Sequence, residues 1–303
     1  MKKGSASRSH FRFCGPLRSF QGLFLYSMKI DAHQHFWQFD AVRDTWITEN
    51  MTAIQRDFGP DDLQPLLEQN GFDGCVAVQA DQTEQETDYL LDLAAQHPFI
   101  QGVVGWVDFR ASNLRQRLDH YAQIPALKGF RHVVQSEPDE LFMLRTEFQD
   151  GIRTLGEYKL TYDILIYPNH LGVAREFVSR FPAQKFVLDH LAKPYIKQGV
   201  IDQWKLDIQA LAQHENVFCK VSGLVTEAGP EHRQRDDFRP YLDTVVEAFG
   251  VDRLLFGSDW PVCLLAAPYD EVVGLVAGYF DAFSNDEKAK IWGGNAVAFY
   301  NLV

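Results

Sequence analysis

Two histidines one residue apart stand near the start of the chain, within the largely apolar run 28–37. Because alternate side chains of a β-strand point to the same face, we expect Asp31, His33 and His35 to share one face of a strand. Two imidazoles side by side on a rigid face form half of a binding site for a divalent metal ion. The pair alone is a weak signal, since surface strands also produce it by chance.

Two later apolar runs also end in residues that bind metals. Residues 187–190 end at His190, and residues 256–261 contain Asp259. Three imidazoles and one carboxylate from different strands converge only if the strands are parallel and closed into a ring. The sequence therefore predicts one site made of His33, His35, His190 and Asp259. Strand alternation predicts two sets of side chains that share a face: Phe186, Leu188 and His190, and Leu255, Gly257 and Asp259.

The elements that must position these residues alternate regularly. Short runs rich in Val, Ile, Phe and Leu are typical of strands buried on both faces, and amphipathic segments between them predict helices. This alternation predicts right-handed crossovers and a parallel sheet, and eight units predict a closed TIM (β/α)8 barrel of the α/β class. The predicted strands are 28–35, 74–79, 100–107, 127–133, 161–167, 185–190, 216–222 and 253–259.

The composition limits the class of protein. The 303 residues carry a net charge of −12, which argues against nucleic acid and anionic membranes as partners. No uninterrupted apolar run reaches the roughly 18 residues that indicate a membrane span. The four cysteines show no zinc-finger or Cys-x-x-Cys spacing, so we expect a reduced, cytoplasmic protein.

We expect residues 28–303 to form one catalytic domain. Residues 1–27 contain no acid, and we expect a disordered extension or a mis-assigned start ahead of Met28.

Polar side chains end most of the predicted strands. In a TIM barrel the catalytic groups lie at the carboxyl ends of the strands. Each such residue is ordinary by itself, but their recurrence at the ends of otherwise apolar strands favours a functional site. These residues are His33, His35, Gln79, Trp106, Asp108, Arg131, His132, Tyr167, His190, Lys220, Ser222 and Asp259.

Several stretches from residue 28 onward resemble the amidohydrolase superfamily, in the branch that hydrolyses sugar and muconate-type lactones. The more specific ones are Asp-His-Leu-Ala-Lys-Pro at 189–194 and Gly-Ser-Asp-Trp-Pro at 257–261. The others are 31–37, 102–108, 128–132, 219–224 and 294–300. The resemblance implies that the barrel opens a lactone ring, with aldonolactones such as L-fuconolactone or L-rhamnonolactone as the substrate class.

The same resemblance bears on the metal. Binuclear members of the superfamily have a carboxylated lysine at the end of the fourth strand and a histidine at the end of the fifth. Here the fourth strand ends in Arg131 and His132 and the fifth in Tyr167, while Lys128 stands too early in its strand to bridge two ions. We therefore expect at most one divalent, zinc-like ion, and a metal-independent hydrolase remains an alternative. The expected metal ligands are His33, His35, His190 and Asp259.

The expected chemistry is ester hydrolysis. A lactone is an ester, and Asp259 is placed to take a proton from the attacking water as general base. The histidines either hold a metal ion or polarise the carbonyl group through hydrogen bonds. The expected catalytic residues are Asp259, His190 and Lys220. The expected substrate-binding residues are Trp37, Gln79, Trp106, Arg131, His132, His170, Lys193 and Trp260.

Three alternatives stay open at this point. A muconate- or pyrone-type dicarboxylate lactonase would favour paired arginines, whereas Arg131 is the one arginine among the predicted strand ends. A metal-dependent aromatic-acid decarboxylase of the same superfamily would use the same histidines and Asp259. A non-catalytic sugar-acid-binding protein would have no use for a base at Asp259. We expect a small-molecule lactone as partner and leave a homo-oligomer open.

Overall fold

The computed structural model describes Met1 and residues 28–229 and 234–302, so the predictions for residues 1–27 lie outside the described residues. Eight strands form one sheet in sequence order, and each pairs in parallel with the next. The strands are β1 (Ile30–Gln34), β2 (Gly74–Val78), β3 (Ile100–Gly105), β4 (Leu127–His132), β5 (Thr161–Ile164), β6 (Phe186–Leu188), β7 (Val217–Val221) and β8 (Leu254–Phe256).

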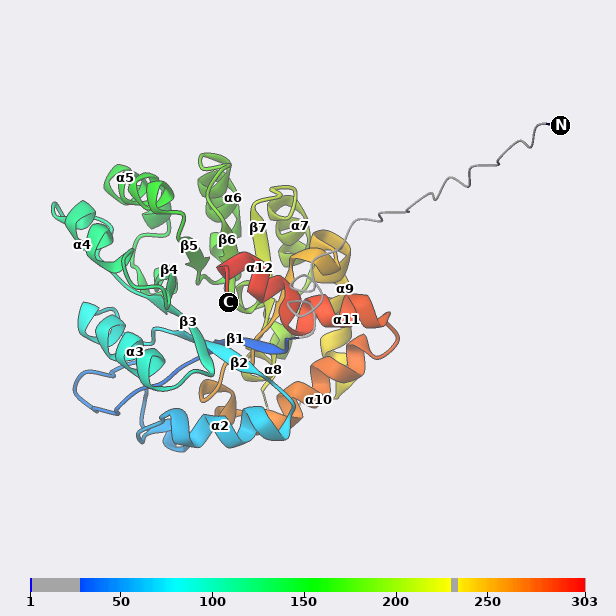
Figure 1. Ribbon diagram of the computed structural model, residues 1–303. Helices are drawn as coiled ribbons and strands as arrows, with labels where there is room; N and C mark the ends of the chain where they lie inside the picture. Colours follow the sequence, from blue (N-terminus) through cyan, green and yellow to red (C-terminus); the bar gives the residue numbers. More distant parts are fainter. Residues whose placement is uncertain (2–27, 230–233, 303) are drawn as a thin grey trace.

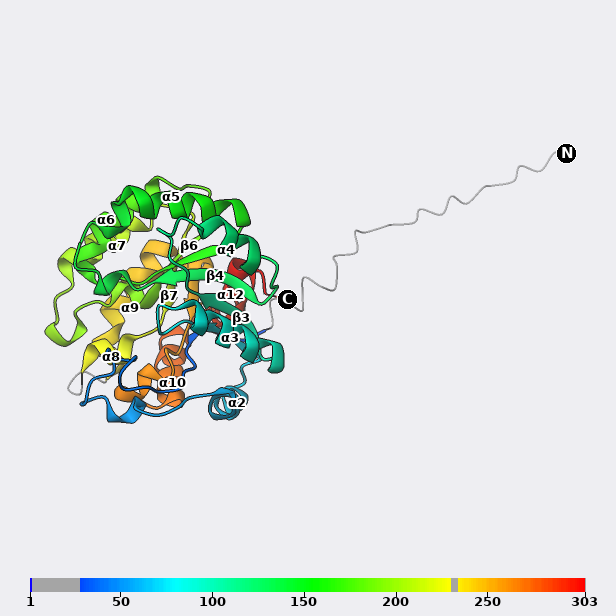
Figure 2. The same ribbon diagram turned by 90° about the vertical axis from the view of Figure 1, so that its left-hand side faces the viewer.

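Helices surround the strands on the outside, as Figures 1 and 2 show from two directions. None of the described helices is long and apolar enough to cross a membrane. The helices are α2 (Pro60–Gln69), α3 (Glu84–Gln96), α4 (Leu114–Tyr121), α5 (Thr146–Leu155), α6 (Leu171–Ser179), α7 (Asp202–Leu211), α8 (Leu224–Ala228), α9 (Arg235–Phe249), α10 (Tyr269–Phe280), α11 (Asn285–Ala289) and α12 (Asn295–Tyr300).

The ring of strands closes at the carboxyl ends of β1 and β8. The main-chain N–H of His35 donates to the carbonyl of Trp260 at 2.7 Å, and the N–H of Asp259 donates to the carbonyl of His33 at 2.8 Å. Gly257 permits this approach, because a Cβ atom there would lie 2.6 Å from Cβ of His33. The predicted TIM barrel is therefore confirmed, and its seam lies at the residues predicted to do chemistry.

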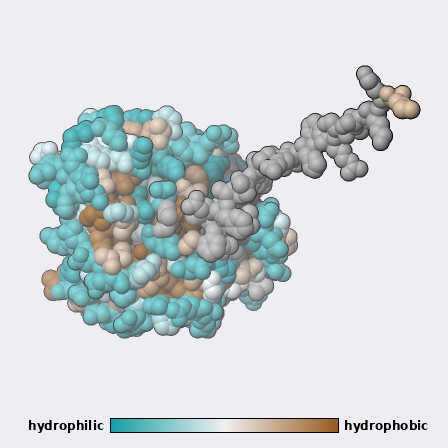
Figure 3. All heavy atoms as spheres, in the orientation of Figure 1, coloured by the Kyte–Doolittle hydropathy of each residue, from teal (hydrophilic) through white to brown (hydrophobic). Residues whose placement is uncertain are grey.

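The core has an inner and an outer layer. The outer layer lies between strands and helices, and hydrophilic residues cover the periphery of the face shown in Figure 3. Helix α12 lies across the centre of the ring in Figure 1 and packs against the inner layer at the amino-terminal end of the barrel. The inner layer consists of Ile30, Ala32, Val76, Val78, Val104, Val187 and Leu255 with Ala296, Val297, Phe299, Tyr300 and Leu302.

A bulge in β1 overturns the prediction that Asp31 shares a face with the two histidines. Asp31 pairs with Cys75 of β2 and Gln34 pairs with Ala77, so three residues of β1 advance against two residues of β2. The extra residue breaks the alternation. The carboxylate of Asp31 instead accepts hydrogen bonds from Tyr269 Oη of α10 at 3.1 Å and from the main-chain N–H of Ser258 at 2.9 Å. Asp31 thus fixes the bulge from the helix side of the barrel.

The predicted face of β6 is also wrong. Val187 belongs to the inner layer, whereas Phe186 and Leu188 pack in the outer layer. His190 therefore does not reach the site by alternation. The strand ends at Leu188, and a left-handed turn with φ between 51° and 59° runs from His190 to Lys193. In β8, Leu255 faces the barrel interior as predicted, but the strand ends at Phe256 and Asp259 has φ 60°, so alternation alone does not place Asp259.

Candidate active site

A cavity of about 250 Å³ opens at the carboxyl ends of the strands. Of the predicted site residues, five line it: His35, Arg131, His190, Lys193 and Asp259. Its remaining walls come from the loops that follow β1, β2, β4, β5 and β8, and they include Arg43, Thr45, Trp46, Ala80, Asp81, Gln82, Val133, Gln135, Ser136, Leu165 and Val262. Most of the polar groups in these walls sit on loops, as is usual for a TIM-barrel site.

The structure brings together the four predicted metal ligands, here called the ligand cluster (His33, His35, His190 and Asp259). Oδ1 of Asp259 lies 3.4 Å from Nε2 of His35 and 3.8 Å from Nε2 of both His33 and His190. Nε2 of His33 and Nε2 of His35 are 3.2 Å apart. All four side chains are nearly or fully buried. The carboxylate oxygen of Asp259 and the Nε2 atoms of His33 and His35 therefore converge on one point, and Nε2 of His190 approaches the same oxygen from another side.

This arrangement fits a single divalent ion. Ligand atoms at zinc–nitrogen and zinc–oxygen bond lengths stand about 3.4 Å apart in a tetrahedron, close to the 3.2–3.8 Å that separate the ligand atoms of His33, His35 and Asp259. The carbonyl of Val78 lies 2.7 Å from Nδ1 of His35 and can only accept, so Nδ1 carries the proton and the Nε2 lone pair stays free. Nδ1 of His190 lies 2.8 Å from Oγ of Ser222, and this contact leaves Nε2 of the same ring facing Asp259.

Beneath the ligand cluster lies a set of buried ion pairs, here called the ion-pair cluster (Arg131, Asp163, Asp189 and Lys220). Nζ of Lys220 is 2.6 Å from Oδ2 of Asp163 and 3.0 Å from Oδ1 of Asp189. Nη1 of Arg131 donates to Oδ2 of Asp189 at 3.0 Å. Two cations and two carboxylates balance, which is the arrangement that permits charge in a barrel interior.

The two clusters meet at His33. Nζ of Lys220 lies 3.0 Å from Nδ1 of His33, and Nη1 of Arg131 lies 3.3 Å from its Nε2. Oδ1 of Asp189 is 3.4 Å from the same Nδ1. A second group of potential metal ligands consists of His33, Asp189 and His190. His33 thus lies between the ligand cluster and two permanent cations.

Burial and charge set the protonation of the ligand cluster. Burial lowers the pKa of His33 and His190 well below 6.5, and at His33 the Lys220 ammonium lowers it further. Burial likewise lowers the pKa of His35. For Asp259, burial by itself would raise the pKa, but the nearby His190 and His35 outweigh it and hold the pKa below 3.8. At neutral pH the site therefore has uncharged imidazoles and an ionised carboxylate, the forms that ligate metals or accept protons.

Unusual backbone conformations position two of the side chains. His190 and Lys193 begin and end the left-handed turn, and Asp259 has φ 60°. Non-glycine residues pay about 1–2 kcal/mol each in this region, and such strain concentrates at functional sites. The turn is held by its buried residues Leu191 and Ala192, and Nε1 of Trp204 donates to the carbonyl of Leu191 at 2.8 Å. Packing beneath the turn thus directs both His190 and Lys193 into the cavity.

Two predicted residues lie directly behind the cavity. Lys220 is fully buried in the ion-pair cluster. Gln79 is also fully buried, and its Oε1 accepts from Nε of Arg131 at 3.0 Å. Both can act on bound substrate only through the side chains that they hold in place.

Other predicted substrate-binding residues do not line the cavity. Nε1 of Trp37 donates to the carbonyl of Arg56, and Trp260 packs against Phe36 and Phe58. Nε1 of Trp106 donates to Nδ1 of His132 at 3.2 Å, and Nε2 of His132 pairs with Glu137 at 2.6 Å. Nδ1 of His170 accepts from the main-chain N–H of Tyr167. The structure gives these five residues partners within the protein, namely Trp37, Trp106, His132, His170 and Trp260.

Sequence reasoning missed Asp189, which contacts Arg131, Lys220 and His33. An alternation that starts from Val187, which the structure places in the barrel interior, would have put Asp189 on the same face. Asp163 does not line the cavity either, since it is fully buried and pairs with Lys220. The cavity-lining residues Arg43 and Trp46 had no signal, because loop conformation has no periodic pattern.

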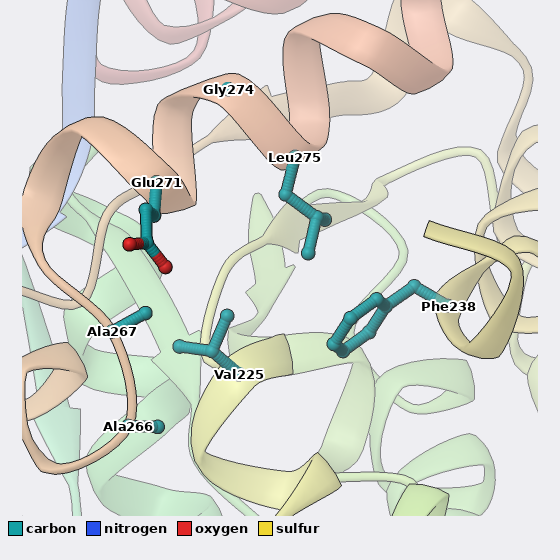
Figure 4. Close-up of a pocket in the computed structure, with 7 residues that line it drawn as sticks. All are labelled: Val225, Phe238, Ala266, Ala267, Glu271, Gly274 and Leu275. Atoms are coloured by element: carbon teal, nitrogen blue, oxygen red, sulfur yellow. The ribbon is translucent and has the colours of Figure 1, made fainter. Parts of the chain in front are cut away.

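A second cavity, of about 290 Å³, lies away from both clusters (Figure 4). Its walls come from α8, α9, α10 and the segment before α10, and Glu271 is the one titratable side chain among them. The residues that line it are Val225, Phe238, Ala266, Ala267, Glu271, Gly274 and Leu275. A single carboxylate among apolar residues offers no catalytic constellation.

Comparison with known proteins gives consistent similarities over the barrel. The family model described as "Amidohydrolase" matches residues 30–302. The L-fucono-1,5-lactonases of Burkholderia ambifaria and Burkholderia multivorans are 38% and 39% identical to this chain, over 91% of it and 96% and 97% of their own lengths. A crystal structure of an amidohydrolase from Burkholderia multivorans with bound zinc has a TM-score of 0.88 at 39% identity and covers 91% of this chain and 100% of that one.

Proposed function

Because the chain belongs to the amidohydrolase family, we propose that it is a lactonase that opens a sugar aldonolactone by attack of water on the ring ester. The observation that carries this proposal is the ionised carboxylate of Asp259, which sits among three uncharged imidazoles at the cavity wall. The similarity to two L-fucono-1,5-lactonases over 91% of the chain supports L-fuconolactone or a closely related sugar lactone as substrate.

The geometry assigns a role to each group around the ester. Asp259 takes a proton from the attacking water as general base. Arg131 and Lys193 line the same cavity and can donate hydrogen bonds to the oxygen on which negative charge develops. The ring oxygen leaves as an alkoxide and must gain a proton, for which the proton held by Asp259 is the nearest source. Lys220 acts from behind the wall, by holding His33 and Asp189.

We propose that the ligand cluster holds at most one divalent, zinc-like ion. The convergence of His33, His35 and Asp259, with His190 3.8 Å from the same Asp259 oxygen, and the zinc-containing relative support this assignment. Bound there, such an ion would polarise the ester carbonyl and lower the pKa of a coordinated water. A second ion is not expected, because the second group of potential ligands shares His33 and His190 with the first, and among the described residues no lysine bridges the two groups: Arg131 stands near the end of β4, and the Lys128 ammonium lies 3.0 Å from the carbonyl of Asn301.

The charges at the cavity favour a neutral polyol lactone over a dicarboxylate. Arg43 pairs with Asp44 at 2.8 Å and Arg131 pairs with Asp189 at 3.0 Å. Lys193 lines the cavity, and no described carboxylate lies within 4.0 Å of its Nζ. A planar dicarboxylate would require two cations free to form bidentate pairs. Lys193 alone among these three cations has no carboxylate partner in the described part of the chain. A single available cation suits a substrate that is uncharged before hydrolysis and carries one carboxylate after it.

The decisive experiment is a pH-indicator assay of a panel of aldonolactones, with metal content measured on the same preparation. Acid release from L-fuconolactone or a related lactone, and none from dicarboxylate lactones, supports the proposal. Release of carbon dioxide from an aromatic acid would favour the decarboxylase, and tight binding of lactones without turnover would favour a binding protein. Either of these results would overturn the proposal.

Two further expectations belong to this proposal. We place the protein in the cytoplasm, which the free, buried state of Cys75, Cys219 and Cys263 supports. We also propose that residues 28–303 form the catalytic domain. A chain that begins at Met28 should then keep full lactonase activity and an unchanged melting temperature, and a drop of several degrees would contradict this boundary.

A further inference from the structure

Tyr300 ends helix α12 and enters the barrel from the end opposite to the cavity. Its side chain is buried in the inner layer of the core, and its ring packs edge to face against Phe299. Tyr300 is not among the residues that line the cavity. Figure 1 shows α12 across the centre of the ring of strands.

The hydroxyl of Tyr300 reaches the ion-pair cluster from below. Oη donates to Oδ2 of Asp163 at 2.7 Å, and the same carboxylate oxygen accepts from Nζ of Lys220 at 2.6 Å. Lys220 in turn lies 3.0 Å from Nδ1 of His33. A continuous chain of short polar contacts therefore runs from the last turn of α12 to the ligand cluster, through two fully buried charged groups.

Asp163 depends on this hydroxyl. Its other oxygen, Oδ1, is buried without a hydrogen-bond partner among the described residues, so Tyr300 and Lys220 supply the hydrogen bonds that the carboxylate receives. A buried acceptor that loses a donor is costly, and the remaining partner must compensate. Without the hydroxyl, the ammonium of Lys220 would be drawn toward Asp163 and away from His33 and Asp189.

We propose that Tyr300 is a positioning residue for hydrolysis, acting through Asp163 on Lys220 and thereby on His33. This inference rests on the proposed lactonase function. The phenol holds the Asp163 carboxylate, the carboxylate holds the Lys220 ammonium, and the ammonium fixes the His33 ring beside Asp259. The closing turn of the C-terminal helix thus contributes to the site from the floor of the barrel.

The first test is Tyr300→Phe, which removes the hydroxyl and keeps the ring. We expect kcat for the best aldonolactone to fall about tenfold, the effect of one lost charge-assisted hydrogen bond. KM should stay within twofold, because Tyr300 does not touch the cavity. An unchanged kcat, or a change confined to KM, would overturn the proposal.

The matched control is Tyr121→Phe. Tyr121 is equally buried, and its hydroxyl donates to Oδ1 of Asp88 at 3.0 Å, but this bond joins α4 to α3 outside the barrel. We expect it to lower the melting temperature without changing kcat. Equal losses of kcat in both variants would show that Tyr300 matters only for stability.

The route through Lys220 is tested by combining variants. In a Lys220→Met background, Tyr300→Phe should cause no further loss of kcat, because the residue through which it acts is absent. If Lys220→Met does not fold, Asp163→Asn takes its place in the same cycle. Independent, multiplicative losses of kcat would contradict this route.

A measurement without substrate separates this inference from the proposed function. In protein labelled with ¹⁵N-histidine, Tyr300→Phe should shift the imidazole resonances of His33, and Tyr121→Phe should leave them in place. Such shifts in a protein that hydrolyses no lactone would retain the positioning and reject the lactonase. Unmoved His33 resonances in an active lactonase would reject the positioning and retain the lactonase.

Discussion

The main-chain N–H of Asp259 donates to the carbonyl of His33 at 2.8 Å, so the barrel closes at the residues that carry the chemistry. The hydrogen bond from His35 to Trp260 completes the closure one step further on. These hydrogen bonds join main-chain atoms, so they set the distance between the carboxylate and the imidazoles without help from the side chains themselves. A change confined to one of these side chains should leave the barrel closed.

Asp259→Asn tests the general base on this basis. The carbonyl oxygen of an amide is a much weaker base than a carboxylate, so we expect turnover of the lactone to fall by about two or more orders of magnitude. Asparagine tolerates the positive φ at this position, so the fold should persist. Steady-state kinetics and a thermal melt measure both effects.

Asp108→Asn is the control, since Asp108 pairs with Arg110 on the surface after β3. It should leave turnover near that of the unmodified protein. A well-folded Asp259→Asn protein with nearly unchanged turnover would exclude Asp259 as the base.

Gly223→Ala should disturb His190. Gly223 has φ 66°, and an added Cβ would lie 2.7 Å from Nδ1 of His190. The left-handed conformation alone should cost about 1–2 kcal/mol of the free energy of unfolding. The steric contact should also displace the imidazole and lower kcat severalfold, measured together with a denaturant titration.

Gly250→Ala separates the two effects. Gly250 also has φ 66°, but no atom lies within 4 Å of the position its Cβ would take. It should show the loss of stability without the loss of kcat. Equal kcat values for the two variants would mean that the contact with His190 is absorbed without consequence.

The fold was predictable because buried parallel strands and amphipathic helices leave periodic signals, and each predicted strand contains an observed one. The four residues of the ligand cluster were predictable from their types at strand ends. The backbone conformations that bring these residues to the site could not be predicted. A bulge turns Asp31 away from the histidines, and a left-handed turn, not alternation, delivers His190. Pattern arguments assume regular strands, and these irregularities depend on tertiary packing.

Substrate contacts were the least predictable part. An aromatic residue at a strand end, such as Trp260, packs equally well into the protein or against a ligand, and here it packs against Phe36 and Phe58. Long-range partners are equally hidden from the sequence. Nothing local to Tyr300 indicates that it contacts Asp163, 137 residues earlier.

Asp31→Asn should change how stability depends on pH. Burial raises the pKa of Asp31 from 3.8 to about 6, despite hydrogen bonds from Ser258, His33 and Tyr269. As pH rises from about 4 to 6, the unfolded chain loses this proton before the folded protein does, so Asp31 makes folding less favourable over this range. An amide does not titrate, so the variant should lack this contribution. Denaturant midpoints at pH 4, 5, 6 and 7 measure the difference, and parallel curves for the two proteins would contradict the expectation.

Metal content tests the ligand cluster directly. We expect no more than one equivalent of a zinc-like ion per chain after dialysis against zinc, and His35→Ala should lose most of it because Nε2 of His35 has a free lone pair facing Asp259. His170→Ala is the control, because that buried histidine accepts from the main-chain N–H of Tyr167 and belongs to neither cluster. Elemental analysis of the three proteins reports the outcome. Two equivalents in the unmodified protein would refute the single site.

Lys193→Met should distinguish substrate from product. The lactone is neutral, whereas hydrolysis creates a carboxylate, and Lys193 is the cavity cation without a described carboxylate within 4.0 Å. A hydrogen bond between ions is worth about 1.5–3 kcal/mol, so inhibition by the product aldonate should weaken about tenfold or more. KM for the neutral lactone should change much less. Lys197→Met serves as control, since exposed Lys197 does not line the cavity and should leave both constants unchanged. Equal changes in the inhibition constant and in KM would show that Lys193 does not respond to the product's charge.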